Sequence, residues 1–152
     1  IKDALSARWP AHQDAFESGF SKLAGELSAL DVEILAIVST NSDQPVLFSH
    51  PVYQYLQARY GIRGRSVHWE PDAMPTEEQW KELEGLLKDH PARWMLWEAK
   101  PDPEIAARLE RLGLGSAVVS PCGNVPREGD LLSVFRQNVE AIRRVFGPRT
   151  EG

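Results

Sequence analysis

Short apolar segments alternate with helical patterns along most of the chain, and this alternation is the feature that most restricts its fold. Each segment is short enough to form one strand, and turn-forming residues mark many of the boundaries. Alternating strands and helices imply βαβ crossovers, in which helices cover both faces of a parallel sheet. We therefore expect an α/β fold with a four-stranded parallel sheet flanked by helices. The expected strands are residues 46–49, 66–70, 93–98 and 116–120.

The helices that follow these strands have recognisable start and stop signals. Thr76 is a good N-cap, Gln79 follows it three residues later, and acidic residues fill the first turn. Glycine ends several of these patterns, as it commonly does at helix C-termini. The expected helices are residues 52–61, 76–90, 102–113 and 130–147.

A long helix is expected ahead of the sheet. Its apolar residues recur at alternating steps of three and four over roughly seven turns. Pro10 suits the first turn, because the N–H that proline lacks has no partner there. We divide the chain into a long helix, residues 1–40, and an α/β domain, residues 41–152. The apolar positions of the helix are Phe16, Phe20, Leu23, Leu27, Leu30, Ile34 and Ile37.

Size and charge limit the classes of function. With 152 residues, 42% of them hydrophobic, the chain can form one domain with a real core. The net charge is −5 and the arginines are scattered among acidic residues, which argues against nucleic-acid binding. No apolar stretch reaches the about 18 residues of a membrane span. The chain starts without Met, in what looks like the end of a helix, so we expect a fragment or a processed product.

Candidate ligands follow the expected strands. Open α/β sheets bind ligands beyond the carboxyl ends of their strands, and His50 stands at the first of these ends. Within residues 66–70, alternation points His68 and Glu70 to the same side of the sheet. Imidazole and carboxylate groups suit zinc or manganese. His50, His68 and Glu70 are therefore the candidate metal ligands.

Each candidate also has an ordinary structural interpretation. His50 can be a helix-start residue whose ring nitrogens are satisfied, and Glu98, after the third strand, more often hydrogen-bonds the next loop. His12 and His90 stand at helix ends, where histidine is common. Cys122 is interpreted as a turn residue. The sequence has no GxSxG motif and no glycine-rich phosphate loop, so no catalytic residue is assigned.

Four segments in order resemble the substrate-binding proteins of zinc and manganese ABC transporters, the cluster A-I metal-binding family. Residues 4–34 resemble the end of one helix and then the rigid helix that links the two lobes of these proteins. The other three resemblances, all typical of the C-terminal lobe, are FSHPVYQYLQARYGI (48–62), SVHWEPDAMPTEEQWKEL (66–83) and SAVVSPCGNVPREGDLLSVFRQNVEAI (116–142).

The resemblance implies that the protein captures a metal ion between two lobes, with His50 as a ligand. The next ligand in the family is a histidine or a glutamate, and both His68 and Glu70 are available here. The last segment of the family often supplies an aspartate, where this chain has Ser120. The resemblance further implies a missing N-terminal lobe, delivery to a membrane ABC permease, and a periplasmic or extracellular location. Zinc is the expected ion, with manganese as the alternative.

Two other functions fit the same residues. A small zinc-dependent hydrolase would use His50 and His68 as ligands, with Glu70 or Glu98 as the base. Alternatively, the domain has lost its metal ligands and serves in protein interaction, an interpretation that Ser120 favours because a neutral hydroxyl is a poor ligand.

Overall fold

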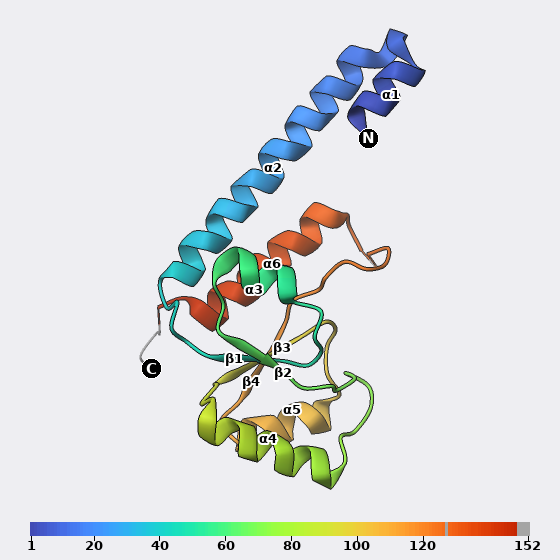
Figure 1. Ribbon diagram of the computed structural model, residues 1–152. Coiled ribbons are helices and arrows are strands. Elements are labelled where there is room, and N and C mark those ends of the chain that lie inside the picture. Colours follow the sequence, from blue (N-terminus) through green and yellow to red (C-terminus); the bar gives the residue numbers. More distant parts are fainter. Residues whose placement is uncertain (127, 149–152) are drawn as a thin grey trace.

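The computed structural model, which describes residues 1–126 and 128–148, contains one four-stranded parallel sheet (Figure 1). The order of the strands is β2-β1-β3-β4, so β1 lies between two neighbours. The predicted α/β class and the parallel sheet are confirmed. The strands are β1 (Val46–Phe48), β2 (Gly64–Ser66), β3 (Trp94–Trp97) and β4 (Gly115–Val118).

Helices cover both faces of the sheet, as parallel connections require (Figure 1). Helices α2, α3 and α6 lie on one face, and α4 and α5 lie on the other. A 3₁₀ turn, Pro10–His12, separates the first two helices. The helices are α1 (Lys2–Arg8), α2 (Gln13–Ser39), α3 (Gln54–Tyr60), α4 (Glu77–Asp89), α5 (Pro103–Arg111) and α6 (Leu131–Phe146).

The long N-terminal helix is confirmed, and it extends well beyond the sheet (Figure 1). Only its C-terminal half joins the core, through the buried side chains of Leu30, Ile37 and Val38. Nearer the N-terminus the same apolar stripe is open to solvent, since Phe20 is 52% exposed and Leu23 44%. The division of the chain at residue 40 stays a prediction. None of the helices in the described ranges is long and apolar enough to cross a membrane.

The observed strand bounds differ from the predicted ones by one or two residues at β1, β3 and β4, and by more at β2. The sequence pattern placed a strand at 66–70, whereas β2 is Gly64–Ser66. The ring of Phe48 lies directly over Gly64, so that an added Cβ would stand 1.9 Å from Phe48 Cε2 and no larger residue fits there without rearrangement. The residues after β2 still run beside β1, because Trp69 N–H donates to Ser49 O over 2.9 Å.

The interior consists of one apolar cluster on each face of the sheet. Alternation along β1 sends Val46 and Phe48 into the cluster beneath α2 and α6, and Leu47 into the cluster beneath α4 and α5. All three side chains are fully buried. Because β1 is packed on both faces, the residues that directly follow it begin from a fixed position.

The predicted start of α4 is confirmed. Thr76 Oγ1 accepts a hydrogen bond from Gln79 N–H, and Gln79 Oε1 accepts one from Thr76 N–H over 2.8 Å. This reciprocal capping box satisfies two amide groups that the first turn of a helix leaves unpaired.

Tyr53 ties the turn after β1 to the end of β4. Its hydroxyl donates to Val119 O over 2.8 Å, and its ring stacks on Phe48 with 4.8 Å between centroids. Burial, and to a lesser extent the charge of Glu98, raises the pKa of Tyr53 well above its ordinary value, so the hydroxyl remains a donor. The first residues beyond the two strands are thereby held together.

Asn138 of α6 fixes the segment beyond β4 in a similar way. Its Oδ1 accepts from Ser120 N–H, and its Nδ2 donates to Ser120 O, both over 2.8 Å. This polar side chain is buried on a helix face that is otherwise apolar. Buried amides persist where they are satisfied in this manner, so Asn138 acts as a clamp on the backbone of Ser120.

We expect Tyr53→Phe to lower the free energy of unfolding by about 1–3 kcal/mol, because the carbonyl of Val119 loses its donor in a buried setting. Tyr55→Phe is the matched control. Tyr55 is 90% exposed, so its loss of hydroxyl should change stability by less than about 0.5 kcal/mol. Urea unfolding followed by tryptophan fluorescence measures both, and equal midpoints for the two variants would contradict the expectation.

A second pair of variants examines the clamp at Ser120. Asn138→Asp replaces the donor Nδ2 by an oxygen facing Ser120 O, and should cost about 1–3 kcal/mol of unfolding free energy at neutral pH. The neighbouring Gln137→Glu makes the same chemical change at an exposed position and should be nearly neutral. If the two substitutions destabilise equally, added negative charge rather than the lost hydrogen bond is responsible.

Candidate metal centre

His50 stands at the carboxyl end of the central strand, one residue beyond buried Ser49. The backbone of Ser49 is bonded on both sides: its N–H donates to Leu96 O, and its carbonyl accepts from Trp69 N–H, each over 2.9 Å. The Cα position of His50 is therefore set by both neighbouring strands, and its side chain emerges where parallel sheets bind ligands.

A carboxylate faces each ring nitrogen of His50. Glu70 Oε1 lies 3.5 Å from Nε2, and Glu98 Oε1 lies 3.4 Å from Nδ1. The side chains of His50 and Glu98 are 25% and 32% exposed, whereas that of Glu70 is 61% exposed. His50 thus lies between the carboxylate of Glu70, which is open to water, and that of Glu98, which is more sheltered.

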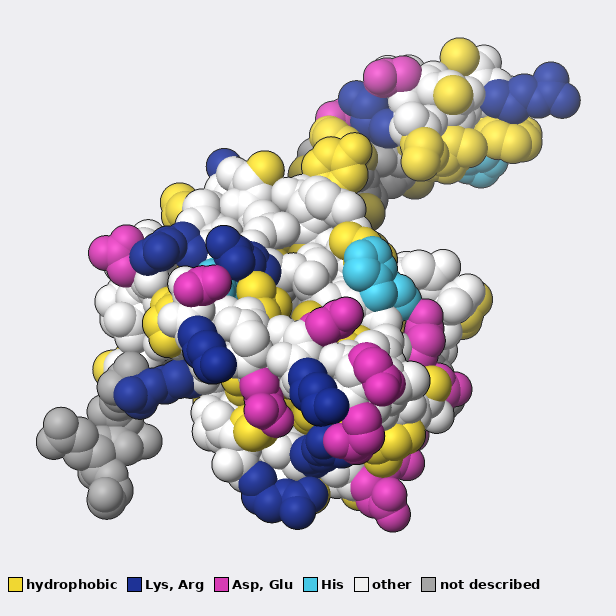
Figure 2. Space-filling model, turned by 60° about the horizontal axis from the view of Figure 1, so that its bottom comes forward, with side chains coloured by type: hydrophobic (Ala, Val, Ile, Leu, Met, Phe, Trp, Pro, Cys, Tyr) yellow, Lys and Arg dark blue, Asp and Glu magenta, His cyan; other side chains and the backbone are white. Residues whose placement is uncertain are grey.

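The alternation predicted for residues 66–70 orients the side chains correctly, although the strand itself ends earlier. Val67 and Trp69 pack towards α4, where the Trp69 and Trp80 rings are 4.6 Å apart. His68 is on the other side with its ring centroid 5.9 Å from that of His50. Figure 2 shows histidine side chains at the surface with acidic side chains close to them.

The three candidate ligands are therefore neighbours, and Glu98 joins them. The sequence favoured Glu98 as a partner of the next loop and offered it as a base only in the hydrolase alternative; in the structure its Oε1 lies 3.4 Å from His50 Nδ1. Within residues 1–126 and 128–148, no group of three or more His, Cys, Asp or Glu is arranged so that it could hold a metal ion. The assignment of His50, His68 and Glu70 as ligands stays a prediction.

Ser120, at the matching end of β4, acts as a turn residue. Its Oγ accepts from Cys122 N–H over 3.3 Å, while Asn138 holds its backbone. Cys122 has a φ of 57°, a left-handed conformation typical of turns, in agreement with its predicted role. A cleft of about 510 Å³ connects this turn to the two carboxylates; its lining includes Glu70, Glu98, Ser120, Cys122 and Gln137.

The remaining two histidines, His12 and His90, do not line this cleft. His90 is buried and its Nε2 lies 2.9 Å from Val46 O, so it fixes the start of β1. His12 is exposed in the 3₁₀ turn before α2. Both agree with the interpretation of these residues as ordinary helix-end histidines.

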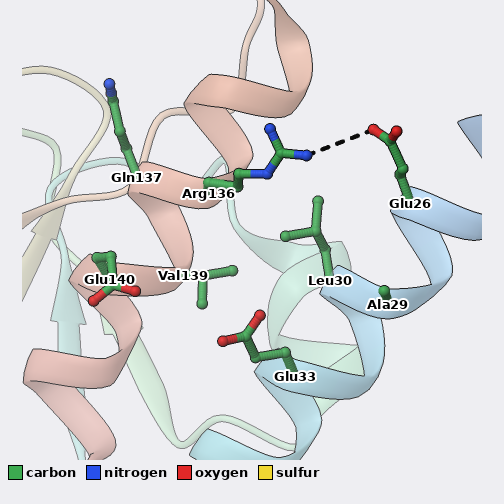
Figure 3. Close-up of a pocket in the computed structure, with 8 residues that line it drawn as sticks. All are labelled: Glu26, Ala29, Leu30, Glu33, Arg136, Gln137, Val139 and Glu140. Atoms are coloured by element: carbon green, nitrogen blue, oxygen red, sulfur yellow. Dashed lines mark ion pairs between the residues drawn. The ribbon is translucent and has the colours of Figure 1, made fainter.

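A second pocket, of about 530 Å³, lies between α2 and α6 (Figure 3). Arg136 of α6 points across it towards Glu26 of α2, and the two form an ion pair at 3.6 Å. The pocket contains none of the candidate ligands. The ion pair between Arg136 and Glu26 joins α2 to α6. It contributes little to stability, because both side chains are partly open to solvent.

Comparison with known proteins gives relatives that bind zinc. The chain is 24% identical over 150 residues to the zinc-binding protein AdcA of Streptococcus pyogenes serotype M1, a match that covers 94% of this chain and 29% of that protein. It is also 24% identical over 161 residues to the zinc-binding lipoprotein AdcA of Streptococcus pneumoniae serotype 4, covering 99% of this chain and 32% of that protein. The chain thus spans about a third of the length of these relatives.

Solved structures share this fold. The Zn(II)-bound ZnuA-like domain of Streptococcus pneumoniae AdcA superposes with a TM-score of 0.84 and 21% identity, over 97% of this chain and 58% of that one. The metal-dependent lipoprotein YcdH of Bacillus subtilis gives a TM-score of 0.85 and 16% identity, with the same coverage of both chains. These likenesses confirm the architecture.

The family model described as "ZnuA: Zinc-uptake complex component A periplasmic" matches residues 1–145, nearly the whole chain. The resemblance drawn from the four sequence segments is confirmed by this match. Members of the family bind metal for transport and are not enzymes, which removes the hydrolase alternative. This chain belongs to the ZnuA family of periplasmic zinc-uptake, substrate-binding proteins of ABC transporters.

Proposed function

We propose that this chain is the C-terminal lobe of a substrate-binding protein that captures zinc outside the cytoplasm and delivers it to a membrane ABC permease. The family match and the zinc-binding relatives, one of them a lipoprotein, support this proposal. The observation that carries it is the position of His50, at the end of the central strand with a carboxylate beside each ring nitrogen. Zinc enters as cargo, and no reaction is catalysed.

In this proposal His50 is the first ligand of the lobe and either His68 or Glu70 is the second. Neutral imidazole nitrogen suits zinc, which accepts nitrogen and oxygen ligands in tetrahedral sites. Glu70 as an additional oxygen ligand would favour manganese, because harder ions prefer oxygen. The exposure of Glu70 leaves its side chain free to turn towards an ion held by His50.

The remaining ligands come from a second lobe. Ser120 offers a neutral hydroxyl already engaged in a turn, so the end of β4 contributes no carboxylate. In the proposed arrangement residues 1–40 form the link between the lobes and residues 41–152 form this lobe. An ion bound by two or three groups at an exposed rim is held firmly only when another surface completes its coordination.

Zinc titration by calorimetry near neutral pH examines the proposal directly, both on this chain and on its full-length natural form. The full-length form should bind zinc tightly. His50→Ala should weaken that binding more than about 100-fold, beyond the about 10–100-fold loss typical of an outer-shell partner. His12→Ala is the matched control and should leave zinc affinity unchanged, because His12 lies in an exposed turn before α2, far from His50 in the sequence.

Two further variants assign the second ligand. Whichever of His68→Ala and Glu70→Gln causes the larger loss of zinc affinity identifies it, and competition with manganese shows which ion is preferred. Zinc affinity that survives His50→Ala unchanged would make His50 a structural residue. Absence of zinc binding from the full-length parent would leave the ligand-depleted interaction domain as the better description.

A further inference from the structure

We propose that Glu98 is a positioning residue for His50: its carboxylate keeps the ring hydrogen of His50 on Nδ1 and so presents Nε2, with its lone pair free, to the metal. The consequence for zinc binding rests on the proposed function. The effect of Glu98 on the His50 ring does not, because it operates without any metal.

The two sides of the His50 ring differ in what they face. Nε2 is directed towards the segment after β2, which carries both His68 and Glu70. Nδ1 is directed towards Glu98, which directly follows β3. One candidate ligand, Glu70, therefore faces Nε2, with His68 on the same segment, and the Glu98 carboxylate faces Nδ1.

Glu98 follows a strand paired on both sides and is less exposed than Glu70. It directly follows Trp97, a fully buried residue paired with Val118, at the end of a strand with neighbours on both sides. Glu70 follows an edge strand that ends four residues earlier. The Glu98 side chain is also about half as exposed as that of Glu70, so water screens its interaction with the ring less.

This arrangement matters because a neutral imidazole has one nitrogen that carries hydrogen and one that carries a lone pair. Only the second can bind a metal, and the partner of the first decides which nitrogen that is. A carboxylate that accepts the other ring N–H is the usual outer partner of a metal-binding histidine. If Glu70 controlled the ring instead, the hydrogen would lie on Nε2 and would block the nitrogen that faces the candidate ligands.

Nitrogen-15 NMR of the histidine rings distinguishes these arrangements in the metal-free chain, above the ordinary histidine pKa of about 6.5. Signals of His50 are those missing from His50→Ala. We expect the Nδ1–H form to dominate in the parent, to be lost in Glu98→Ala, and to be reduced in Glu98→Gln, whose neutral oxygen accepts more weakly. Glu110→Ala, at an exposed position of α5, removes the same charge and should have no effect.

An Nε2–H form in the parent, or an Nδ1–H fraction unchanged by loss of Glu98, overturns the proposal. If Glu98→Ala does not fold, Glu98→Gln provides the test. An Nδ1–H fraction that is unchanged in Glu98→Gln also overturns the proposal. In the full-length form, zinc affinity should fall about 10–100-fold in Glu98→Ala, less in Glu98→Gln, and not in Glu110→Ala. If no form binds zinc, the proposed function is refuted. The nitrogen-15 NMR measurement on the metal-free chain still tests the role of Glu98.

Discussion

The backbone pairing of β1 with both of its neighbours is the constraint on which the rest of the domain depends. Phe48 and Ser49 exchange hydrogen bonds with the segments on either side, and both faces of the strand are sealed by apolar packing. A shift by one residue would exchange Leu47 with Val46 and Phe48 between the two apolar clusters, so the packing on both faces opposes it. The position of His50, and the carboxylates that face it, follow from that fixed register.

Much of this fold could be predicted because local signals and global packing agree. The capping box at Thr76 and the all-apolar β1 and β3 indicate their elements without tertiary information. Strand β2 is different, because Gly64, Arg65 and Ser66 have little preference for β structure. Its place is defined by backbone pairing with β1 and by the close approach of the Phe48 ring to Gly64, contacts that no local pattern reveals.

The candidate site shows the same limit. The carboxyl-end rule and strand alternation bring His50, His68 and Glu70 together correctly, although their role as ligands stays a prediction. The place of Glu98 depends on the pairing of β3 with β1, which sequence alone does not give. Asn138 did leave a signal, since a polar residue within the apolar face of a helix usually has a buried partner.

The site combines attraction of a cation with incomplete enclosure. Carboxylates 3.4 and 3.5 Å from the His50 ring concentrate negative potential at the rim of the sheet, which favours the approach of a divalent ion. Because these carboxylates are partly exposed, a cation at this rim would have little shelter from water. A carrier has to release its cargo as well as bind it, and under the proposed function closure by a second lobe supplies that control. The long helix projects beyond the domain and leaves Phe20 and Leu23 uncovered, which is compatible with the proposed link to that lobe.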